Sequence, residues 1–229
     1  PIMIHVLALF LISTLASCAS CSSDLKENGK ENGKEEKPDT EEVRPESFAS
    51  DDEMLDYIQK VHLNYMWDGA EPTSGLARER IHMDGVYPEN DQNVITSGGS
   101  GFGIMAILAG IDRGYVTRQE GLERMEKIVS FLETADRFHG AYPHWWYGDT
   151  GKVKPFGQKD NGGDLVETAF IMQALLSVHQ YYIAGSPAEQ ALAARIDKLW
   201  REVDWNFYRQ NGQNVLYWHW SPEYGWEMN

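Results

Sequence analysis

Residues 97–114 read SGGSGFGIMAILAGIDRG, and this run gives the clearest indication of the architecture. Its middle, residues 104–111, is almost entirely apolar, which fits a helix buried on most sides. The small residues before it would let a second helix approach closely, and Gly114 is a typical C-terminal stop. The run also resembles a phosphate-binding loop, but no Lys-Ser/Thr pair follows it and no strand is predicted before it. We therefore expect a buried helix within a helical domain.

Four more segments carry helical signals. Apolar residues recur at helical intervals after Ser50, Thr117 and Asp164, and each of these residues is followed three positions later by Glu, the spacing of a capping box. Ser186-Pro187 opens a last helix. Helices are expected at residues 50–67, 97–114, 117–137, 164–178 and 186–203. In the tail, residues 206–220 (NFYRQNGQNVLYWHW) predict a small β-hairpin that turns at Asn211-Gly212.

The order of these segments predicts an all-α fold of the α/α-toroid type. Helices alternate with short turns and with long aromatic loops, which would gather at one end of a toroid. A complete (α/α)6 barrel needs more helices than the sequence contains. We therefore expect residues 47–229 to be the N-terminal part of a larger, truncated barrel domain with the hairpin near its C-terminus.

Composition excludes several classes of function. The formal net charge of the 229 residues is −15, which disfavours binding to nucleic acid. The two cysteines, Cys18 and Cys21, both lie near the start, so the folded part has no disulfide, thiolate metal site or cysteine nucleophile. The seven histidines are scattered, with no pair at metal-ligand spacing on one helix. We expect no metal and no cofactor.

The first 46 residues are predicted to lie outside the folded domain. Residues 2–12 (IMIHVLALFLI) suit the apolar part of a secretory signal and are too short to span a bilayer. Residues 15–18 (LASC) resemble a bacterial lipobox, with Cys18 as the lipidated residue, and Cys21 is a weaker match. The alternative is an ordinary cleaved signal. We expect a signal and anchor over residues 1–23, and a disordered acidic tether over residues 24–46. The mature protein would be an exported lipoprotein in the periplasm or on the outer membrane of a Gram-negative bacterium.

Three carboxylates form the leading candidate for chemistry. The segment DNGGDLVE, residues 160–167, places Asp160, Asp164 and Glu167 at and before a helix start, beside a long aromatic loop. Paired carboxyl groups next to aromatic side chains are what glycoside hydrolysis uses. The structural alternative is that Asp164 and Glu167 only form a capping box. A helix N-terminus also favours ionised carboxylates, and the two roles are compatible.

Aromatic residues supply candidate platforms for the apolar faces of sugars. Residues 144–147 read HWWY, and residues 217–220 read YWHW. Strand alternation would put Trp218 and Trp220 on one face, with Tyr217 and His219 on the other. The alternative for any one of these side chains is core packing. The candidate substrate-binding residues are His144, Trp145, Trp146, Trp218, Trp220 and Trp226.

Five segments in order carry a family resemblance. TSGLARER (73–80), VITSGGSGFGIMAILAGIDRGYVTR (94–118), HGAYPHWW (139–146), DNGGDLVETAFIMQALL (160–176) and YWHWSPEYGWEMN (217–229) together resemble the bacterial glucoamylase-like family, which includes endo-β-1,2-glucanases. The resemblance implies an (α/α)6 barrel that hydrolyses glucan, with inversion, and with Asp160, Asp164 and Glu167 lining the substrate cleft. It also implies that further essential carboxylates, including the general acid, follow residue 229.

The sequence therefore predicts a glycoside hydrolase acting on β-1,2-glucan or a related β-glucoside by carboxylate acid–base catalysis. Action on α-1,4-glucan stays open, because the name of the family suggests it. The expected partners are a glucan or oligosaccharide and, through the lipid anchor, a membrane; we expect a monomer that binds no nucleic acid. The alternatives are a non-catalytic glycan-binding surface lipoprotein and a polysaccharide lyase built on a similar toroid.

Overall fold

The computed structural model describes residues 45–227. The chain divides into two units, Pro1–Glu46 and Ser47–Asn229. The predicted signal, the candidate lipidation site Cys18 and nearly all of the predicted tether lie outside the described residues. Within residues 45–227, no helix is both long enough and apolar enough to cross a bilayer.

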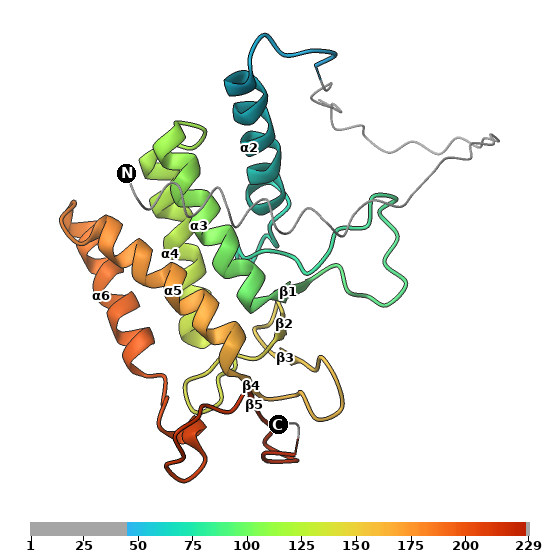
Figure 1. Cartoon of the computed structure of the whole chain (residues 1–229), viewed down its shortest axis with the longest axis vertical. Helices are drawn as coiled ribbons and strands as arrows, with labels where there is room; N and C mark the ends of the chain where they lie inside the picture. The colour runs from blue at the N-terminus through green and yellow to red at the C-terminus, as the bar shows by residue number, and fades with distance from the viewer. Residues whose placement is uncertain (1–44, 228–229) are drawn as a thin grey trace. The chain divides into compact units, whose positions relative to one another are not determined.

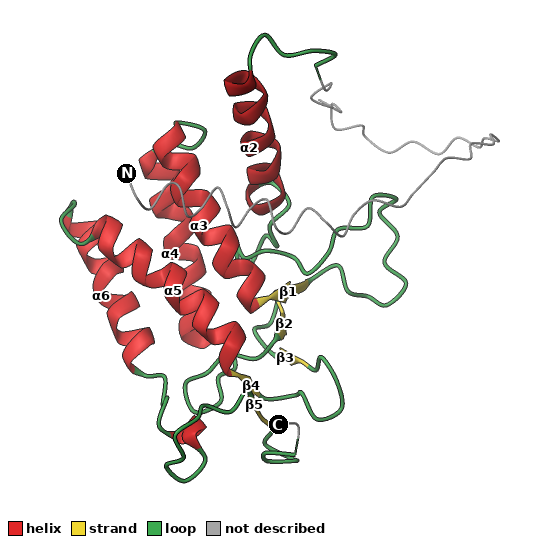
Figure 2. Ribbon diagram, viewed as in Figure 1, coloured by secondary structure: helices red, strands yellow, loops and turns green. Residues whose placement is uncertain are grey.

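The described part is mostly helical, as predicted. Figures 1 and 2 show its helices lying beside one another, with short strands at one end. The helices are α2 (Asp51–Trp67), α3 (Ser97–Arg113), α4 (Arg118–Thr134), α5 (Leu165–Tyr182) and α6 (Pro187–Arg201), followed by the 3-10 turn η2 (Phe207–Arg209). The strands are β1 (Val94–Thr96), β2 (Trp145–Tyr147), β3 (Val153–Lys154), β4 (Gly163–Asp164) and β5 (His219–Trp220).

The helix ends follow the sequence signals. Thr117 and Glu120 form a complete capping box at the start of α4, as predicted. The helix α3 ends where Gly114 takes the left-handed conformation, with φ of 74°. At α5 only half of the predicted box forms, because Asp164 accepts the Glu167 N–H while the Glu167 side chain turns elsewhere. Each such cap stabilises its helix by about 1 kcal/mol.

Helices α3 and α5 run parallel and in close contact, which explains the small residues of α3. A Cβ atom at Gly101 would lie 2.7 Å from the Phe170 carbonyl oxygen, so the two backbones approach too closely there for any side chain. The expected role of the SGGSGFG run in helix packing is thus confirmed. Because the two helices are parallel, their N-termini lie at the same end of the domain (Figure 1).

The core lies between these helices and the pair α4 and α6. Buried side chains such as Met125, Leu132, Leu175 and Ile196 fill it, and each fully buried side chain of this kind contributes about 1.5–3 kcal/mol. Trp146 joins this core: its ring is fully buried against Phe131 and Tyr142, and its indole N–H donates to the Asp136 carbonyl. The structure therefore corrects Trp146 from a substrate platform to a core residue.

The predicted C-terminal hairpin does not form. Asn211 and Gly212 do take the positive φ values of a tight turn, 65° and 82°. The segment before them, however, folds into η2, whose Tyr208 is fully buried. Strand β5 instead pairs antiparallel with β4, which lies more than fifty residues earlier in the sequence. The prediction was wrong because the partner of β5 is distant in sequence.

Candidate functional site

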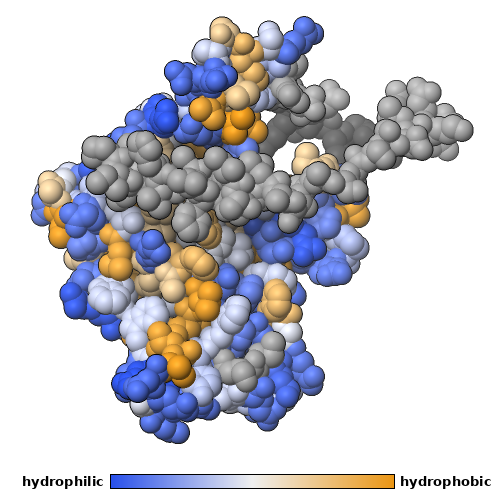
Figure 3. All heavy atoms as spheres, in the orientation of Figure 1, coloured by the Kyte–Doolittle hydropathy of each residue, from blue (hydrophilic) through white to orange (hydrophobic). Residues whose placement is uncertain are grey.

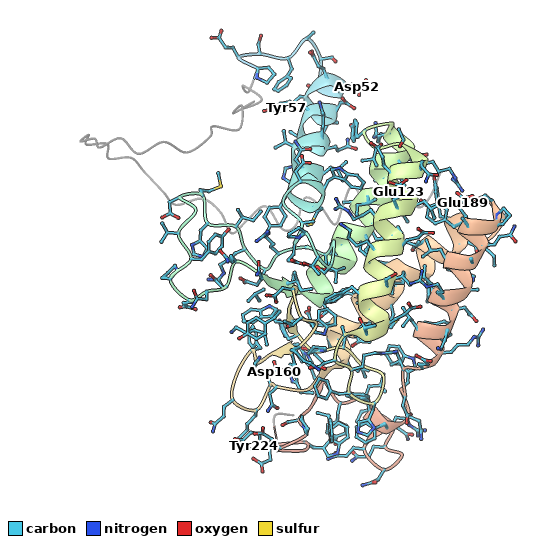
Figure 4. All side chains as sticks on the ribbon, turned by 180° about the vertical axis from the view of Figure 1, so that it is seen from behind. Asp52, Tyr57, Glu123, Asp160, Glu189 and Tyr224 are labelled. Atoms are coloured by element: carbon cyan, nitrogen blue, oxygen red, sulfur yellow. The ribbon has the colours of Figure 1, made fainter. Side chains whose placement is uncertain are left out.

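The candidate site lies where the N-termini of α3 and α5 meet the short strands. β1, β2 and β3 form one antiparallel sheet at the N-terminal end of α3, and β4 and β5 form another at the N-terminal end of α5. Figure 4 shows Asp160 at this end of the domain, with Glu123 and Glu189 at the opposite end of the helices. The polar residues predicted as catalytic therefore gather at one end of a helical scaffold.

Strand register explains how Asp164 and His219 meet. In the β4–β5 pair, Asp164 lies directly opposite His219. Side chains at such positions project to the same face with Cβ atoms about 5 Å apart. The two side chains accordingly join, with His219 Nε2 3.1 Å from Asp164 Oδ2. Next to this pair, the Leu165 N–H donates to the Trp218 carbonyl at 2.8 Å, which holds β5 against the start of α5.

Asp164 is fully buried and lies at the centre of a hydrogen-bond network. Its Oδ2 accepts from His144 Nδ1 at 3.0 Å as well as from His219. Its Oδ1 accepts from Trp218 Nε1 and from the Glu167 backbone N–H, both at 2.9 Å. Four donors from three parts of the chain therefore converge on one carboxylate.

Asp160 shares both imidazoles with Asp164. Its Oδ2 lies 3.3 Å from His219 Nε2 and 3.8 Å from His144 Nδ1. Asp160 is also buried, with 4% of its surface exposed. The predicted grouping of Asp160, Asp164 and Glu167 around one helix start is what the structure contains, with the two histidines added to it.

Glu167 is half-buried and reaches across to α3. Its Oε2 accepts the Gly98 backbone N–H at 2.7 Å, and this bond takes the place of the missing half of the capping box. A Cβ atom at Gly98 would lie 2.8 Å from the Glu167 Cδ atom, so a glycine is required where this carboxyl group approaches the helix. Glu167 thus lies between the N-termini of two helices.

The carboxyl groups differ in their ionisation. Burial opposes the ionisation of Asp164, but the hydrogen bonds from His144, His219 and the Glu167 backbone outweigh it and lower the pKa to about 2. For Glu167 the balance is reversed, because burial outweighs the Gly98 N–H and raises the pKa above its usual value. The pKa of Asp164 is therefore lowered and that of Glu167, three residues later, is raised. Such unlike carboxyl groups close together are typical of acid–base sites.

Both imidazoles hold their protons more tightly than usual. Burial alone would lower the pKa of His219, but its bonds to Asp160 and Asp164 raise it to about 9. The pKa of His144 is raised in the same way, chiefly by its hydrogen bond to Asp164. At neutral pH the network therefore pairs the His219 imidazolium with the Asp164 carboxylate.

The same four residues are the best candidates for a metal site among residues 45–227. His144, Asp160, Asp164 and His219 each offer one ligand atom, and these atoms lie within 4.8 Å of one another. An ion would have to displace both imidazole protons, because ligating imidazoles are neutral. One nitrogen of each imidazole, His144 Nδ1 and His219 Nε2, already lies within hydrogen-bond distance of Asp164 Oδ2. We therefore describe the cluster as an ion-paired network.

The aromatic candidates divide into an exposed group and a packed group. Trp218 is 50% exposed while its indole N–H is held by Asp164, so its ring faces solvent beside the network. Trp145 is half-buried and stands edge-on to Phe156. Trp220 and Trp226 pack instead around Phe207. Trp218 and Trp145 therefore lie on the accessible side of the cluster, while Trp220 and Trp226 belong to the packing around Phe207.

Three site residues had no role in the sequence prediction. For His219 the sequence pattern predicts only a place on one face of a strand, although alternation along YWHW does separate it from Trp218. For Gly98 it predicts only a role in helix packing. Phe156, which is 51% exposed and stacks on His144 at 4.2 Å, was not singled out at all. Each of them becomes recognisable only once the residues from other segments are in place.

Comparison with known proteins supports the predicted resemblance. No family model matches the chain. A curated relative, the exo β-1,2-glucooligosaccharide sophorohydrolase (non-reducing end) of Parabacteroides distasonis, is 50% identical over 182 residues, which are 79% of this chain and 24% of the relative. The chain therefore spans about a quarter of the length of this curated relative.

Solved structures give closer matches. A protein of Bacteroides caccae, provisionally named a glucoamylase, is 78% identical with a TM-score of 0.77, over 78% of this chain and 43% of that one. The endo-β-1,2-glucanase of Chitinophaga pinensis, solved with sophorotriose and glucose, is 67% identical with a TM-score of 0.77, over 79% and 43%. Close homologues of the chain are thus glucoamylase-like proteins and β-1,2-glucanases, as the motifs indicated, and it spans less than half of each.

Proposed function

We propose that this chain, a homologue of bacterial β-1,2-glucanases, carries part of the active site of a glycoside hydrolase that cleaves β-1,2-linked glucan. The observation that carries the proposal is the half-buried Glu167 carboxyl group, whose pKa is raised, at the start of α5 beside the buried carboxyl groups of Asp160 and Asp164. They lie beside the half-exposed ring of Trp218. The names of two homologues supply the linkage.

The chemistry needs a proton donor and a proton acceptor. Hydrolysis breaks the bond between the anomeric carbon and the bridging oxygen; the leaving oxygen gains a proton, and the attacking water loses one. Glu167 is suited to exchange a proton, because its pKa is raised above its usual value and its carboxyl group is only half-buried. We propose that a further carboxyl group, which we expect beyond residue 229, acts as the general acid. We expect inversion at the anomeric carbon, which proton NMR of the first product anomer would test.

The fold supports a site of this kind if the helices close into an (α/α)6 barrel. One side of α5 is buried against the core, and its other side carries exposed apolar residues, among them Val166, Phe170 and Leu176. Figure 3 shows apolar side chains gathered on the face where α5 lies. We propose that α3 and α5 form inner helices of such a barrel, with α4 and α6 outside them.

The leader supports a proposed location. Residues 15–18 form the lipobox-like LASC, so we propose that the protein is exported, lipidated at Cys18 and held at a membrane surface as a monomer. Incorporation of radiolabelled palmitate, lost in Cys18→Ala and kept in Cys21→Ala, would test the anchor.

The activity is tested by a linkage panel. The full-length protein, expressed without its leader, is incubated with β-1,2-, β-1,3-, β-1,4- and α-1,4-glucans, and released reducing ends are measured. Release from β-1,2-glucan, and little from the others, is the expected result. Glycan binding without release from any polymer would contradict the proposal and favour a non-catalytic binding protein. Products that absorb in the ultraviolet would indicate a lyase instead.

A further inference from the structure

The Asp164 carboxylate has no capacity left for substrate. An ionised carboxylate offers about four lone-pair positions, and Asp164 uses one for each of four donors: His144, His219, Trp218 and the Glu167 backbone. None of its surface is exposed. A group that donates or takes a proton in catalysis must reach the reacting atom within hydrogen-bond distance, and this carboxylate is enclosed by its donors on every side.

The backbone of Asp164 is fixed as firmly as its side chain. Its N–H donates to the Tyr142 carbonyl at 2.8 Å, and its carbonyl accepts from the Thr168 hydroxyl at 2.6 Å. The same Thr168 hydroxyl accepts the Tyr142 N–H at 2.8 Å. The carboxylate therefore has a rigid base, on a helix start and a strand, from which it can set the positions of other groups.

The side chains that donate hydrogen bonds to Asp164 surround the exposed part of the site. Trp218 is half-exposed, and its indole N–H donates to Asp164 Oδ1 while its ring stacks on His219. His144 leads into β2 and stacks on the exposed ring of Phe156. His219 joins Asp164 to Asp160. One buried carboxylate thus connects two exposed aromatic rings with the second buried aspartate.

We infer that Asp164 is a positioning residue, not a catalytic one: its carboxylate orients the Trp218 indole and the imidazoles of His144 and His219 around Asp160 and Glu167. This inference rests on the proposed function, since it says how one of the three acidic residues of the site contributes. It separates Asp164 from Glu167, which the resemblance places together in the cleft. The proton exchange then belongs to Glu167, and Asp164 supplies geometry and negative charge.

The variant that isolates this role is Asp164→Asn. Asparagine caps helices about as well as aspartate, so its carbonyl oxygen can keep the bonds to the Glu167 N–H and to Trp218. Its NH2 group then takes the place of Oδ2 and faces two imidazole N–H groups, which lose Asp164 as an acceptor and have only Asp160 Oδ2 nearby. The matched control is Thr117→Asn, which keeps an N-cap residue on α4 and lies on the capping box, remote from the network.

The first readout is the titration of the imidazoles by NMR in the full-length protein, which does not depend on hydrolysis. In wild type, His219 should titrate near its pKa of about 9. Removing the Asp164 charge should lower that pKa by about 1–3, because an opposite charge within 4–6 Å has an effect of this size. Asp160 and Glu167 remain near the two imidazoles and should keep part of the shift. Thr117→Asn should leave both imidazoles as they are.

The second readout is the pH profile of β-1,2-glucan hydrolysis. A positioning residue displaced by about 1 Å costs roughly 100-fold in rate. In Asp164→Asn we expect such a loss in kcat/KM while both limbs of the profile remain. If a limb disappears while the imidazoles titrate as in wild type, Asp164 is itself the acid or base and the inference is overturned. If wild type hydrolyses no glucan, the proposed function fails, and the NMR titration still tests the network.

A second variant keeps the test decisive should Asp164→Asn fold poorly. His219→Gln retains an N–H donor that can reach Asp164, and His219→Ala does not. Under a positioning role, His219→Gln should keep at least about tenfold more activity than His219→Ala, and Trp218 fluorescence in His219→Gln should resemble wild type. Equal activity of the two variants would contradict the inference.

Discussion

Replacing Gly98 by alanine should separate the activity of the protein from its stability. The added Cβ would lie 2.8 Å from Glu167 Cδ and 3.0 Å from Oε1, so the carboxyl group must move away from α3. That movement breaks the 2.7 Å bond from the Gly98 N–H. A hydrogen bond to a charged group is worth about 1.5–3 kcal/mol. If this energy acts on the reacting state, kcat/KM should fall by roughly 10- to 150-fold.

The same substitution should not destabilise the fold. Gly98 lies within α3 at a negative φ, where alanine is favoured over glycine by about 0.5–1 kcal/mol. The obstructing atoms belong to the end of a flexible side chain, which can turn away. Thermal denaturation should therefore give an unchanged Tm or a rise of up to about 4 °C.

The control is Gly103→Ala in the same helix. There the added Cβ would lie 3.1 Å from Met66 Sδ, well away from the carboxyl groups, so kcat/KM should stay within about twofold of wild type. Rates measured on β-1,2-glucan, with Tm from circular dichroism, decide the matter. A Tm lowered by several degrees with unchanged kcat/KM in Gly98→Ala would refute the account of this contact.

Three other predictions concern aromatic residues and pH. Trp218→Ala should raise KM or the dissociation constant for a β-1,2-gluco-oligosaccharide at least about tenfold, because truncating a buried or stacked Trp at a binding site costs about 2 kcal/mol. Calorimetric titration measures the dissociation constant, and an unchanged value would show that Trp218 does not contact the substrate. Trp146→Ala should lower Tm by about 10 °C, because removing a core Trp costs about 3–5 kcal/mol; a small change in Tm would contradict its place in the core. Stability should fall on both sides of a plateau between about pH 4 and 6.5. The raised pKa of His219 gives stability that is complete below about pH 6.5 and is lost as pH rises toward 9, while the lowered pKa of Asp164 gives stability that is present above about pH 4 and is lost toward pH 2. Urea denaturation at several pH values measures it, and equal or greater stability at pH 9 than at pH 6 would contradict the ion-paired network.

The helices could be predicted from the sequence because their signals are local. Thr117 and Glu120 lie three residues apart, and the cap they form needs nothing from the rest of the chain. Gly114 is likewise a local stop. The long apolar run of α3 leaves little choice of structure, and its glycines already indicated that another helix would lie against it.

The network around Asp164 could not be predicted in the same way, because its members come from distant segments. His219 meets Asp164 only through the β4–β5 pairing, and no turn signal links those two strands. A search for histidines at metal-ligand spacing on one helix also misses a cluster assembled from two loops and two strands. The hairpin was expected because Asn211-Gly212 is a turn pair, but a turn does not specify which strand β5 pairs with.

The two neighbouring tryptophans of HWWY illustrate the remaining limit. Adjacent residues in a strand point to opposite faces, so one of Trp145 and Trp146 had to face inward. The sequence does not say which. The register of β2 between β1 and β3 decides it, placing Trp146 in the core and leaving Trp145 half-exposed.

The central claim, that Glu167 exchanges a proton in glucan hydrolysis and is more than a helix-capping residue, is tested most directly by one pair of variants. Glu167 and Glu120 both occupy the third position of a helix, but Glu120 completes its capping box and is remote from the site. Hydrolysis of β-1,2-glucan at saturating substrate should fall at least about 100-fold in Glu167→Gln and stay near wild type in Glu120→Gln, with both proteins folded. Near-wild-type turnover in Glu167→Gln would contradict the account and leave Glu167 as a residue that only joins two helix ends.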